Sequence, residues 1–499
     1  MKYALDAAMS KNADSYTINE MGVPPLVLME RAALAVASKT AEIAAGFCRQ
    51  VRICAVCGCG NNGADGVAAA RILTWQGLPV DIIIAGDENK CSREFAVQAQ
   101  IARRSGMSFC NISSIKEYDI VIDAVFGTGL SRCVDGVYAD IINGINSCRS
   151  VTVSVDIPSG VSADTGRAQG AAVRADATVT FGWNKQGLLL YPGRELAGEI
   201  TVADIGFCPK ALANLKPAMY FTPEDIGGIP ARLASANKGT YGRTLVIAGS
   251  ENMSGAAYLA AAAAYKSGVG LAEVFTHASN CGVIRTLLPE AIVTGYDADN
   301  ASELLEPLLN KADTVILGPG LSTDGTAEGI VKKVLAQAGQ PLIIDADALN
   351  IISADTSILK SCASTVIITP HIGEMARLAG KDKSEILADT VKAAADFARE
   401  YGVICVLKND ATVVAEPNGG RRVYINNSGC AAMAKGGSGD VLTGVIAGML
   451  ALRIEPFSAA AMGAYVHGLA GEAASRDCGS HSVVASDILE RLGRVMENN

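Results

Sequence analysis

The sequence lacks the features of a membrane-inserted or exported protein. Hydrophobic residues make up 49% of its 499 residues, yet no uninterrupted apolar run reaches the ~18–20 residues that a membrane span needs. The first ten residues carry a lysine and no apolar core of ~7–15 residues before a cleavage site, so no signal peptide is predicted. We therefore expect a cytoplasmic protein with no membrane partner.

An excess of positive charge and a zinc-type ligand set are also missing. Lysine and arginine number 42 against 51 acidic residues, giving a net charge of −9. This balance argues against a broad nucleic-acid surface, so no nucleic-acid partner is expected. Cys54, Cys57 and Cys59 have no second Cys/His pair near them in the sequence. We interpret them as buried, reduced thiols, in keeping with a cytoplasmic location.

The chain divides at a proline-bearing segment. Its length exceeds what one hydrophobic core usually supports, and four prolines fall between residues 206 and 237. On both sides, apolar strand-like runs alternate with helix-like segments, a rhythm that predicts doubly wound α/β sheets. The predicted strands are 51–57, 80–85, 119–125, 151–157 and 177–181, then 244–248, 314–317, 342–345, 365–369 and 403–407. No internal repeat relates the two halves.

A glycine-rich tract marks the second half. Gly436, Gly437, Ser438 and Gly439 run into Asp440 and an apolar helix-like segment, 441–450. A glycine-rich turn that opens a helix presents free N–H groups and the positive end of the dipole, which suits a phosphate. A carboxylate at the first helical position can act as a general base. The tract resembles the anion hole of ribokinase-type kinases; the alternative is a closely packed helix that Ser438 or Asp440 merely caps.

The first half has its own phosphate-type turn. Gly58, Gly60 and Gly63 lie between an apolar strand and a helix with the G-x-G-x-x-G spacing. This spacing by itself would favour a dinucleotide-binding dehydrogenase. That pattern alone is weak. Asn61, Asn62 and Asp65 add polar side chains that a backbone cradle for pyrophosphate does not need.

Further polar residues follow the next strands. Asp123, Asp156 and Ser159 lie at predicted carboxyl ends, where open α/β sheets bind ligands. Asn62, Asp123 and Ser159 could surround one monovalent cation with oxygen atoms, and Asp156 would face the same crevice. Each acid alone is more often a cap or turn residue, but the three together favour a binding site.

These motifs, taken in order, resemble the bifunctional NAD(P)H-hydrate repair enzymes, in which an epimerase is fused to an ADP/ATP-dependent dehydratase. The likeness covers nearly the whole chain. It rests on Leu28-Met-Glu-Arg-Ala32, Asn61-Asn-Gly-Ala-Asp65-Gly, Asp123 with Gly127-Thr-Gly-Leu, Asp156-Ile-Pro-Ser-Gly160, Gly318-Pro-Gly-Leu, Asp345-Ala-Asp-Ala-Leu-Asn350, Thr369-Pro-His-Ile-Gly-Glu374 and Gly436-Gly-Ser-Gly-Asp440. The resemblance implies a Rossmann-like epimerase domain (1–215), a linker (216–236) and a ribokinase-like dehydratase domain (237–499).

The resemblance also implies site residues, matched position by position. The epimerase substrate would be held by Asn61, Asn62, Gly63, Ala64, Asp65, Gly127, Thr128, Gly129, Leu130, Ser131, Arg132, Cys133, Tyr138 and Asp156, with potassium at Asn62, Asp123 and Ser159. The dehydratase substrate would be held by Ala256, Gly320, His371 and Asp440, and the adenine nucleotide by Lys408, Asn409, Asp410, Ala411, Thr412 and Gly439. Asn409 and Cys430 depart from the family's usual residues, which bears on nucleotide preference more than on the reaction.

The implied chemistry is repair of NADHX and NADPHX, the hydrated forms of the reduced nicotinamide cofactors. Asp156 would assist epimerisation at the hydroxylated ring carbon, either by loss and return of oxygen or by ring opening and closure. Asp440 would accept the hydroxyl proton during phosphorylation by ADP or ATP with Mg²⁺, after which phosphate leaves. A homo-oligomer is also expected. The alternative is a ribokinase-type small-molecule kinase whose first domain only binds a nucleotide or a protein.

Overall fold

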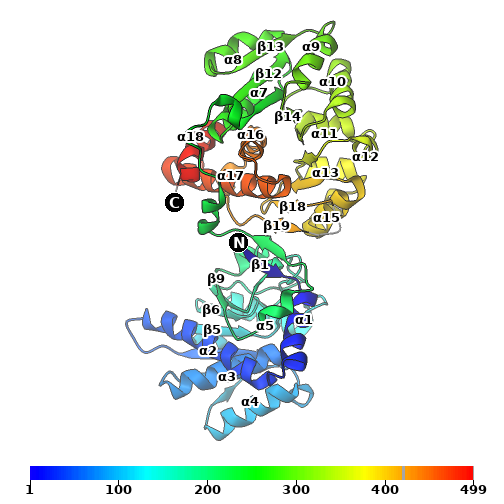
Figure 1. The fold of residues 1–499 in the computed structure, drawn as a ribbon. Coiled ribbons are helices and arrows are strands. Elements are labelled where there is room, and N and C mark those ends of the chain that lie inside the picture. The colour runs from blue at the N-terminus through cyan, green and yellow to red at the C-terminus, as the bar shows by residue number, and fades with distance from the viewer. Residues whose placement is uncertain (418–421, 498–499) are drawn as a thin grey trace. The chain divides into compact units, whose positions relative to one another are not determined.

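The computed structural model describes residues 1–417 and 422–497, and its chain forms two compact units (Figure 1). The amino-terminal unit is Tyr3–Ala218, and the carboxy-terminal unit comprises Met1–Lys2 and Met219–Asn499. In the described part of the chain, no helix is long and apolar enough to cross a bilayer.

The amino-terminal unit contains a parallel sheet in the order β4-β3-β2-β5-β6-β7-β9. Its strands are β2 (Ile53–Gly58), β3 (Val80–Ala85), β4 (Phe109–Cys110), β5 (Ile120–Ala124), β6 (Val151–Val155), β7 (Ala177–Phe181) and β9 (Glu199–Ala203). The neighbouring strands are paired in parallel throughout this order. The predicted doubly wound sheet is confirmed, because strands buried on both faces are the ones that appear as continuous apolar runs.

Helices cover both faces of this sheet and close its two cores. They are α1 (Ala7–Ser15), α2 (Pro25–Ala45), α3 (Asn61–Trp75), α4 (Arg93–Arg104), α5 (Gly136–Asn146) and α6 (Gly193–Leu196). Apolar residues of α2, α3 and α4 share one core with the sheet. Those of α5 pack with Val56 and Val121 on the other face. A short parallel pair, β1 (Lys2–Leu5) with β8 (Asn184–Lys185), brings Leu5 beside Lys185.

The carboxy-terminal unit contains a mixed sheet in the order β13-β12-β11-β14-β15-β16-β17-β18-β19-β10. Its strands are β10 (Ala218–Tyr220), β11 (Arg243–Ile247), β12 (Leu271–His277), β13 (Ile292–Tyr296), β14 (Thr314–Leu317), β15 (Leu342–Ile344), β16 (Val366–Ile368), β17 (Ile404–Leu407), β18 (Val413–Ala415) and β19 (Val423–Ile425). The predicted strands are all present. The strands β12 and β13 and the antiparallel β17–β18–β19 meander were not predicted from the sequence.

Helices of this unit are α7 (Ser254–Lys266), α8 (Cys281–Leu287), α9 (Ala301–Leu309), α10 (Gly325–Gln337), α11 (Ala346–Ile352), α12 (Ile358–Ser361), α13 (Ile372–Ala379), α14 (Lys383–Ala388), α15 (Thr390–Tyr401), α16 (Ser438–Ala451), α17 (Pro456–Cys478) and α18 (Ala485–Glu497). The helices α7, α16, α17 and α18 share one core with the sheet. Helix α16 lies centrally in that group (Figure 1). A Cβ atom added to Gly444 would lie 2.3 Å from the Ala260 carbonyl, so glycine permits α16 to pack closely on α7.

Candidate functional site

The carboxyl edge of the amino-terminal sheet carries two adjoining cavities, of about 730 and 550 Å³. They share Asn61, Asp65, Asp156 and the loop residues 128–131. Asn61 opens α3 directly after β2, and Asp156 directly follows β6. Residues far apart in the sequence therefore meet where open α/β sheets bind ligands.

Most of the predicted epimerase residues line these cavities, but three do not. The larger set is Asn61, Asn62, Asp65, Gly127, Thr128, Gly129, Leu130, Ser131, Arg132, Tyr138 and Asp156. Gly63 and Ala64 are buried in the first turn of α3, and Cys133 is exposed outside the cavities. A Cβ atom on Gly63 would lie 1.7 Å from the Gly58 carbonyl oxygen, so this glycine fixes the approach of α3 to β2.

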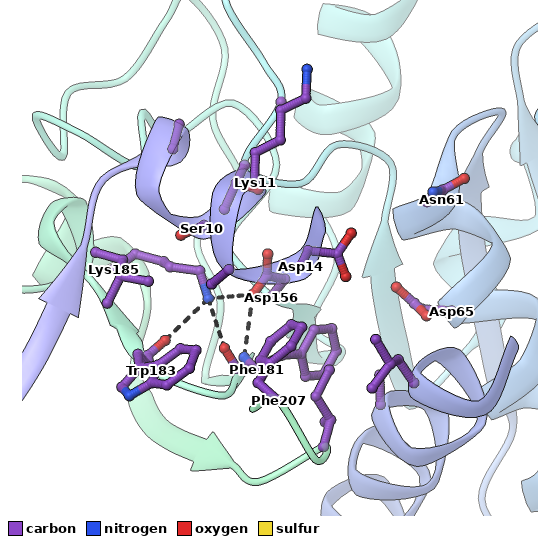
Figure 2. A pocket seen from close by; sticks show the side chains of 18 of the residues that line it. Ser10, Lys11, Asp14, Asn61, Asp65, Asp156, Phe181, Trp183, Lys185 and Phe207 are labelled. Atoms are coloured by element: carbon purple, nitrogen blue, oxygen red, sulfur yellow. Dashed lines mark hydrogen bonds and ion pairs between the residues drawn. The ribbon is translucent and has the colours of Figure 1, made fainter. Parts of the chain in front are cut away.

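Asp156 is held by a buried lysine (Figure 2). Lys185 Nζ donates to Asp156 Oδ1 at 2.8 Å, and the Lys185 side chain is only 4% exposed. Thr180 Oγ1 and the Phe181 N–H group donate to the same oxygen at 3.1 and 3.3 Å. Asp156 also has φ +65°, a left-handed conformation that an aspartate adopts at some cost. These contacts fix the Asp156 carboxyl group at the cavity wall.

Two further carboxyl groups face the same cavity as Asp156. Burial raises the pKa of Asp65 well above its usual range, and the negative charges of Asp156 and Asp14 raise it further. Burial and the charge of Asp156 likewise raise the pKa of Asp14. Both residues line the larger cavity (Figure 2). Asp156 is paired with the Lys185 ammonium group, whereas burial and nearby negative charge destabilise the anionic forms of Asp65 and Asp14. The cavity therefore combines a proton acceptor with proton donors.

Of the three residues predicted to bind a cation, Asp123 and Ser159 are in direct contact, and Asn62 is not bonded to either of them in the described structure. Asp123 is fully buried and accepts from Ser159 Oγ at 2.6 Å, the Ser159 N–H group at 2.9 Å and Ser154 Oγ at 2.8 Å. Burial nonetheless raises the pKa of Asp123, and the hydrogen bonds from Ser159 oppose that rise. Asn62 lines the smaller cavity, and its side-chain Nδ2 is buried without a partner in the described structure. A buried carboxyl group that accepts hydrogen bonds only from neutral donors is compatible with a monovalent cation beside it.

In the carboxy-terminal unit, Asp440 lies in the first turn of α16. This helix begins at Ser438 after Gly437, which has φ +90°, so Asp440 is its third residue rather than the predicted first. No side chain in the described structure caps this helix, which contradicts the alternative of a capping role for Ser438 or Asp440. Burial raises the pKa of Asp440 to about 7; Asp345 contributes to the rise and Lys408 opposes it. A carboxyl group titrating near neutral pH suits a general base.

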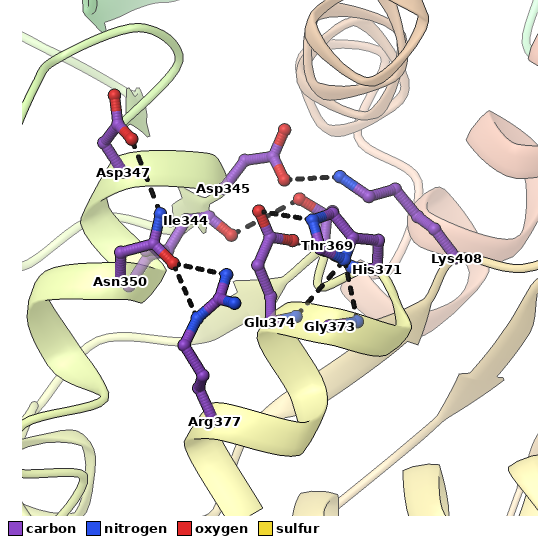
Figure 3. A network of polar contacts seen from close by, with 10 residues as sticks. All are labelled: Ile344, Asp345, Asp347, Asn350, Thr369, His371, Gly373, Glu374, Arg377 and Lys408. Carbon is purple, nitrogen blue, oxygen red and sulfur yellow. Dashed lines mark hydrogen bonds and ion pairs between the residues drawn. The ribbon is translucent and has the colours of Figure 1, made fainter. Parts of the chain in front are cut away.

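Beside Asp440 lies a buried ion pair that joins two strand ends (Figure 3). Lys408 Nζ lies 2.6 Å from Asp345 Oδ1. Burial alone would lower the pKa of Lys408, but Asp345 and Glu374 raise it overall. A Cβ atom added to Gly439 would lie 3.2 Å from Lys408 Nζ and 3.5 Å from Asp345 Oδ2. The pair therefore lies against the first turn of α16, where free N–H groups favour an anion.

The other predicted dehydratase residues lie in the first turns of helices or in loops that follow strands. His371 caps α13 by accepting from Gly373 N–H at 2.9 Å, and it pairs with Lys408 through a parallel bridge. Gly320 has φ +60° and lies close to Ala256: a Cβ atom added to Gly320 would lie 2.9 Å from the Ala256 Cβ. The predicted nucleotide residues Asn409, Asp410, Ala411 and Thr412 connect β17 to β18.

Sequence reasoning missed three charged groups at these sites. Lys185 and Asp14 belong to the first cavity, and Asp345 lies beside Asp440. Lys185 stands in a short tract with no local motif, so nothing in the sequence connects it to Asp156. Asp345 stands in a motif that was recognised, but its pairing with Lys408 spans 63 residues.

The fold and the two sites define a class of protein: a two-domain α/β enzyme with a Rossmann-like and a ribokinase-like domain. Residues 244–494 match the family described as NAD(P)H-hydrate dehydratase, and residues 25–187 match the family described as YjeF-related protein N-terminus. The bifunctional NAD(P)H-hydrate repair enzyme Nnr of Moorella thermoacetica is 37% identical over 99% of this chain and 97% of its own length. That of Escherichia coli is 33% identical over 88% of this chain and 84% of its own length.

A solved structure agrees with the assignment of the second domain. The ADP/ATP-dependent NAD(P)H-hydrate dehydratase from Bacillus subtilis, crystallised with ATP and Mg²⁺, is 33% identical with a TM-score of 0.50. The match covers 55% of this chain and 96% of the other. The chain belongs to the family of bifunctional NAD(P)H-hydrate repair enzymes.

Proposed function

We propose that the chain repairs hydrated NADH and NADPH through two reactions in separate domains. The amino-terminal unit exchanges the R and S epimers of NAD(P)HX, and the carboxy-terminal unit dehydrates the S epimer at the expense of ADP or ATP. Family membership along almost the whole chain supports both activities. The observation that carries the second is Asp440, titrating near neutral pH at the start of α16 beside the Asp345–Lys408 pair.

In the first reaction, Asp156 is the proton acceptor, and Lys185 Nζ orients its carboxyl group at 2.8 Å. Asp65, whose pKa burial raises well above its usual range, retains a proton and can donate it. When the ring opens, Asp156 accepts the hydroxyl proton and Asp65 donates to the ring nitrogen. When the hydroxyl departs instead, Asp65 donates to its oxygen, which leaves as water, and Asp156 accepts a proton from the water that adds back. Either route passes through a planar carbon that is attacked from the opposite face, which inverts the centre.

In the second reaction, Asp440 accepts the hydroxyl proton as the oxygen attacks the terminal phosphorus of ADP or ATP. The N–H groups in the first turn of α16 hold the phosphoryl oxygens as charge develops on them. The C–O bond of the phosphorylated intermediate then breaks with the ring nitrogen's electron pair, and loss of the neighbouring proton restores the dihydronicotinamide. Lys408–Thr412 and Gly439 are proposed to hold the adenine nucleotide.

Two cations complete the proposal. Asn62, Asp123 and Ser159 would hold a potassium ion, which supplies the positive charge that the buried Asp123 carboxylate lacks. Neutral oxygens around one carboxylate suit a monovalent ion better than Mg²⁺ or Ca²⁺. Mg²⁺ would accompany the nucleotide, as in the ATP/Mg²⁺ structure of the Bacillus subtilis dehydratase.

A single assay tests the proposed function. The full chain is given mixed epimers of NADHX with ADP or ATP, and the absorbance of reduced cofactor is followed. Complete conversion requires both activities, whereas conversion that stops at the S fraction shows dehydration without epimerisation. Accumulation of a stable phosphorylated compound would instead identify a small-molecule kinase and contradict the proposal.

A further inference from the structure

A separate cavity of about 360 Å³ opens at the carboxyl ends of β11, β12, β13 and β14. Ser250 follows β11, His277 ends β12, Tyr296 ends β13 and Asp324 follows β14. None of the residues assigned above to the substrate or nucleotide lines it. Its volume lies within the range of small-molecule sites, and its edge of the sheet is the one at which such sites form.

The side chain of Tyr296 is the main feature of this cavity that indicates a binding site. Its side chain is almost fully buried, with 4% of the residue exposed, and it stacks on Phe275 at a centroid distance of 4.6 Å. Burial raises the pKa of Tyr296 to about 12. In the described parts of the chain, no group forms a hydrogen bond with its hydroxyl. The residue as a whole is buried, but its hydroxyl is not among the side-chain atoms that are buried without a partner, so it is accessible from the cavity that Tyr296 lines. A ligand in the cavity can therefore supply its hydrogen bond.

The backbone at the same place is strained. Ser322, which lines the cavity, has φ +73°, a conformation that favours glycine. Its N–H group donates to Asp347 at 2.9 Å and its hydroxyl to Asp324 at 3.0 Å. Strained backbone held by its surroundings is typical of ligand-binding segments.

The charge of the lining restricts the ligand. Glu251 and Asp324 line the cavity, and its described lining includes no lysine or arginine. Hydrogen bonds from the Ala327 N–H group and from Ser322 lower the pKa of Asp324 despite partial burial, so it is ionised at neutral pH. Carboxylates accept hydrogen bonds from hydroxyl groups and repel phosphates. A neutral, hydroxyl-bearing group such as a ribose with its base fits this lining.

The cavity is connected to the dehydratase site through Gly320. The Ser250 N–H group donates to the Gly320 carbonyl oxygen at 2.6 Å, and Leu321, the next residue, lines the cavity. From β15, which ends just before Asp345, the sheet passes through β14 and β11 to β12 and then β13. At about 4.8 Å per strand, the strand ends around the cavity lie about 5–19 Å from that of β15, with His277 and Tyr296 at the far end.

We propose that this cavity binds the adenosine end of the dinucleotide hydrate, and that Glu251 and Asp324 make the dehydratase prefer NADHX to NADPHX. The inference rests on the proposed dehydratase function. A free 2′-hydroxyl donates to these carboxylates, whereas the 2′-phosphate that distinguishes NADPHX is repelled by them. The nicotinamide end lies at Asp440 and the two phosphates between lie near Gly320 and Ala256.

The test measures kcat/KM for the S epimers of NADHX and NADPHX with saturating ADP, in the full chain and in Asp324→Asn. Asparagine keeps the cap of α10, in which Asp324 accepts from Thr326 and Ala327. Removing the charge should lower the NADHX-to-NADPHX ratio about three- to tenfold, mainly through KM for NADPHX. Glu251→Gln should act in the same direction. Asp355→Asn, an exposed carboxylate that accepts from Ser357, is the matched control and should leave the ratio unchanged.

Tyr296→Phe provides an independent readout. If the hydroxyl bonds the ligand, its removal should raise KM for both substrates about two- to tenfold, leave kcat unchanged and not lower the melting temperature. A preference of the parent chain for NADPHX would overturn the proposal. So would unchanged ratios in Asp324→Asn and Glu251→Gln together with an unchanged KM in Tyr296→Phe. Absence of dehydration of either substrate by the parent chain would instead refute the proposed function itself.

Discussion

Replacing Asp440 by asparagine should stabilise the dehydratase domain while abolishing its activity. Burial, with help from Asp345, raises the pKa of Asp440 from 3.8 to about 7. Each pKa unit corresponds to about 1.4 kcal/mol, so the ionised form costs the native state up to about 4 kcal/mol. Water reaching the site reduces this cost, and asparagine avoids it. A gain of about 1–4 kcal/mol is therefore expected at pH 8.

The gain should depend on pH in a defined direction. The pKa in the folded state lies above that in the unfolded state, so between about pH 4 and pH 7 the native state binds a proton that the unfolded chain has released. Stability of the parent chain is therefore lost as pH rises through that interval, and Asp440→Asn should not show this loss. The two proteins should melt alike near pH 4, diverge as the pH rises to 7, and differ by a constant amount above it.

Differential scanning calorimetry of the full chain measures this effect in the transition that ADP shifts upward. A domain of this size moves by roughly 2–4 °C for each kcal/mol. The same variant should lose about 10² or more of the dehydration rate for the S epimer. Because the epimerase site lies in the other unit, R-to-S exchange should continue. A variant that melts like the parent at pH 8 would refute the assigned ionisation, and full repair by it would remove Asp440 from the chemistry.

Three further predictions concern the epimerase site. Asp156→Asn should abolish epimer exchange, followed by NMR of the R and S forms, without unfolding the domain; unchanged exchange would move the proton acceptor elsewhere. Lys185→Met should leave the partly buried Asp156 without its ion pair and destabilise the domain by about 1–3 kcal/mol in urea melts, whereas Lys185→Arg should restore part of the loss; equal stability of both variants and the parent would contradict the ion pair. Replacing potassium by a bulky organic cation should weaken substrate affinity, measured by calorimetry, because Asn62, Asp123 and Ser159 then lack their cation, and equal affinity in both salts would remove the ion from the site.

The sequence alone determined the elements that depend on local pattern. The apolar runs of β2, β5, β6, β11 and β14 were predicted because strands of a parallel sheet are buried on both faces. Glycine-rich turns and strand-end carboxylates were likewise visible as short motifs, and their order identified the family. The strands β12, β13, β18 and β19 escaped prediction, and length does not explain all four, because β15 and β16 are as short as β18 and β19 and were predicted.

Only the tertiary structure decided which charges meet. Lys185 and Asp156 are 29 residues apart, and Lys408 and Asp345 are 63 apart, so the order of strands in each sheet brings them together. The same order places Tyr296 and Asp324 around a cavity that no single motif contains. Burial and neighbouring charge then set the pKa of Asp65 and Asp440, which have the same side chain but different surroundings. Sequence supplies the ionisable groups, but their protonation depends on long-range packing because electrostatic free energy depends on distance and solvent access rather than on position in the chain.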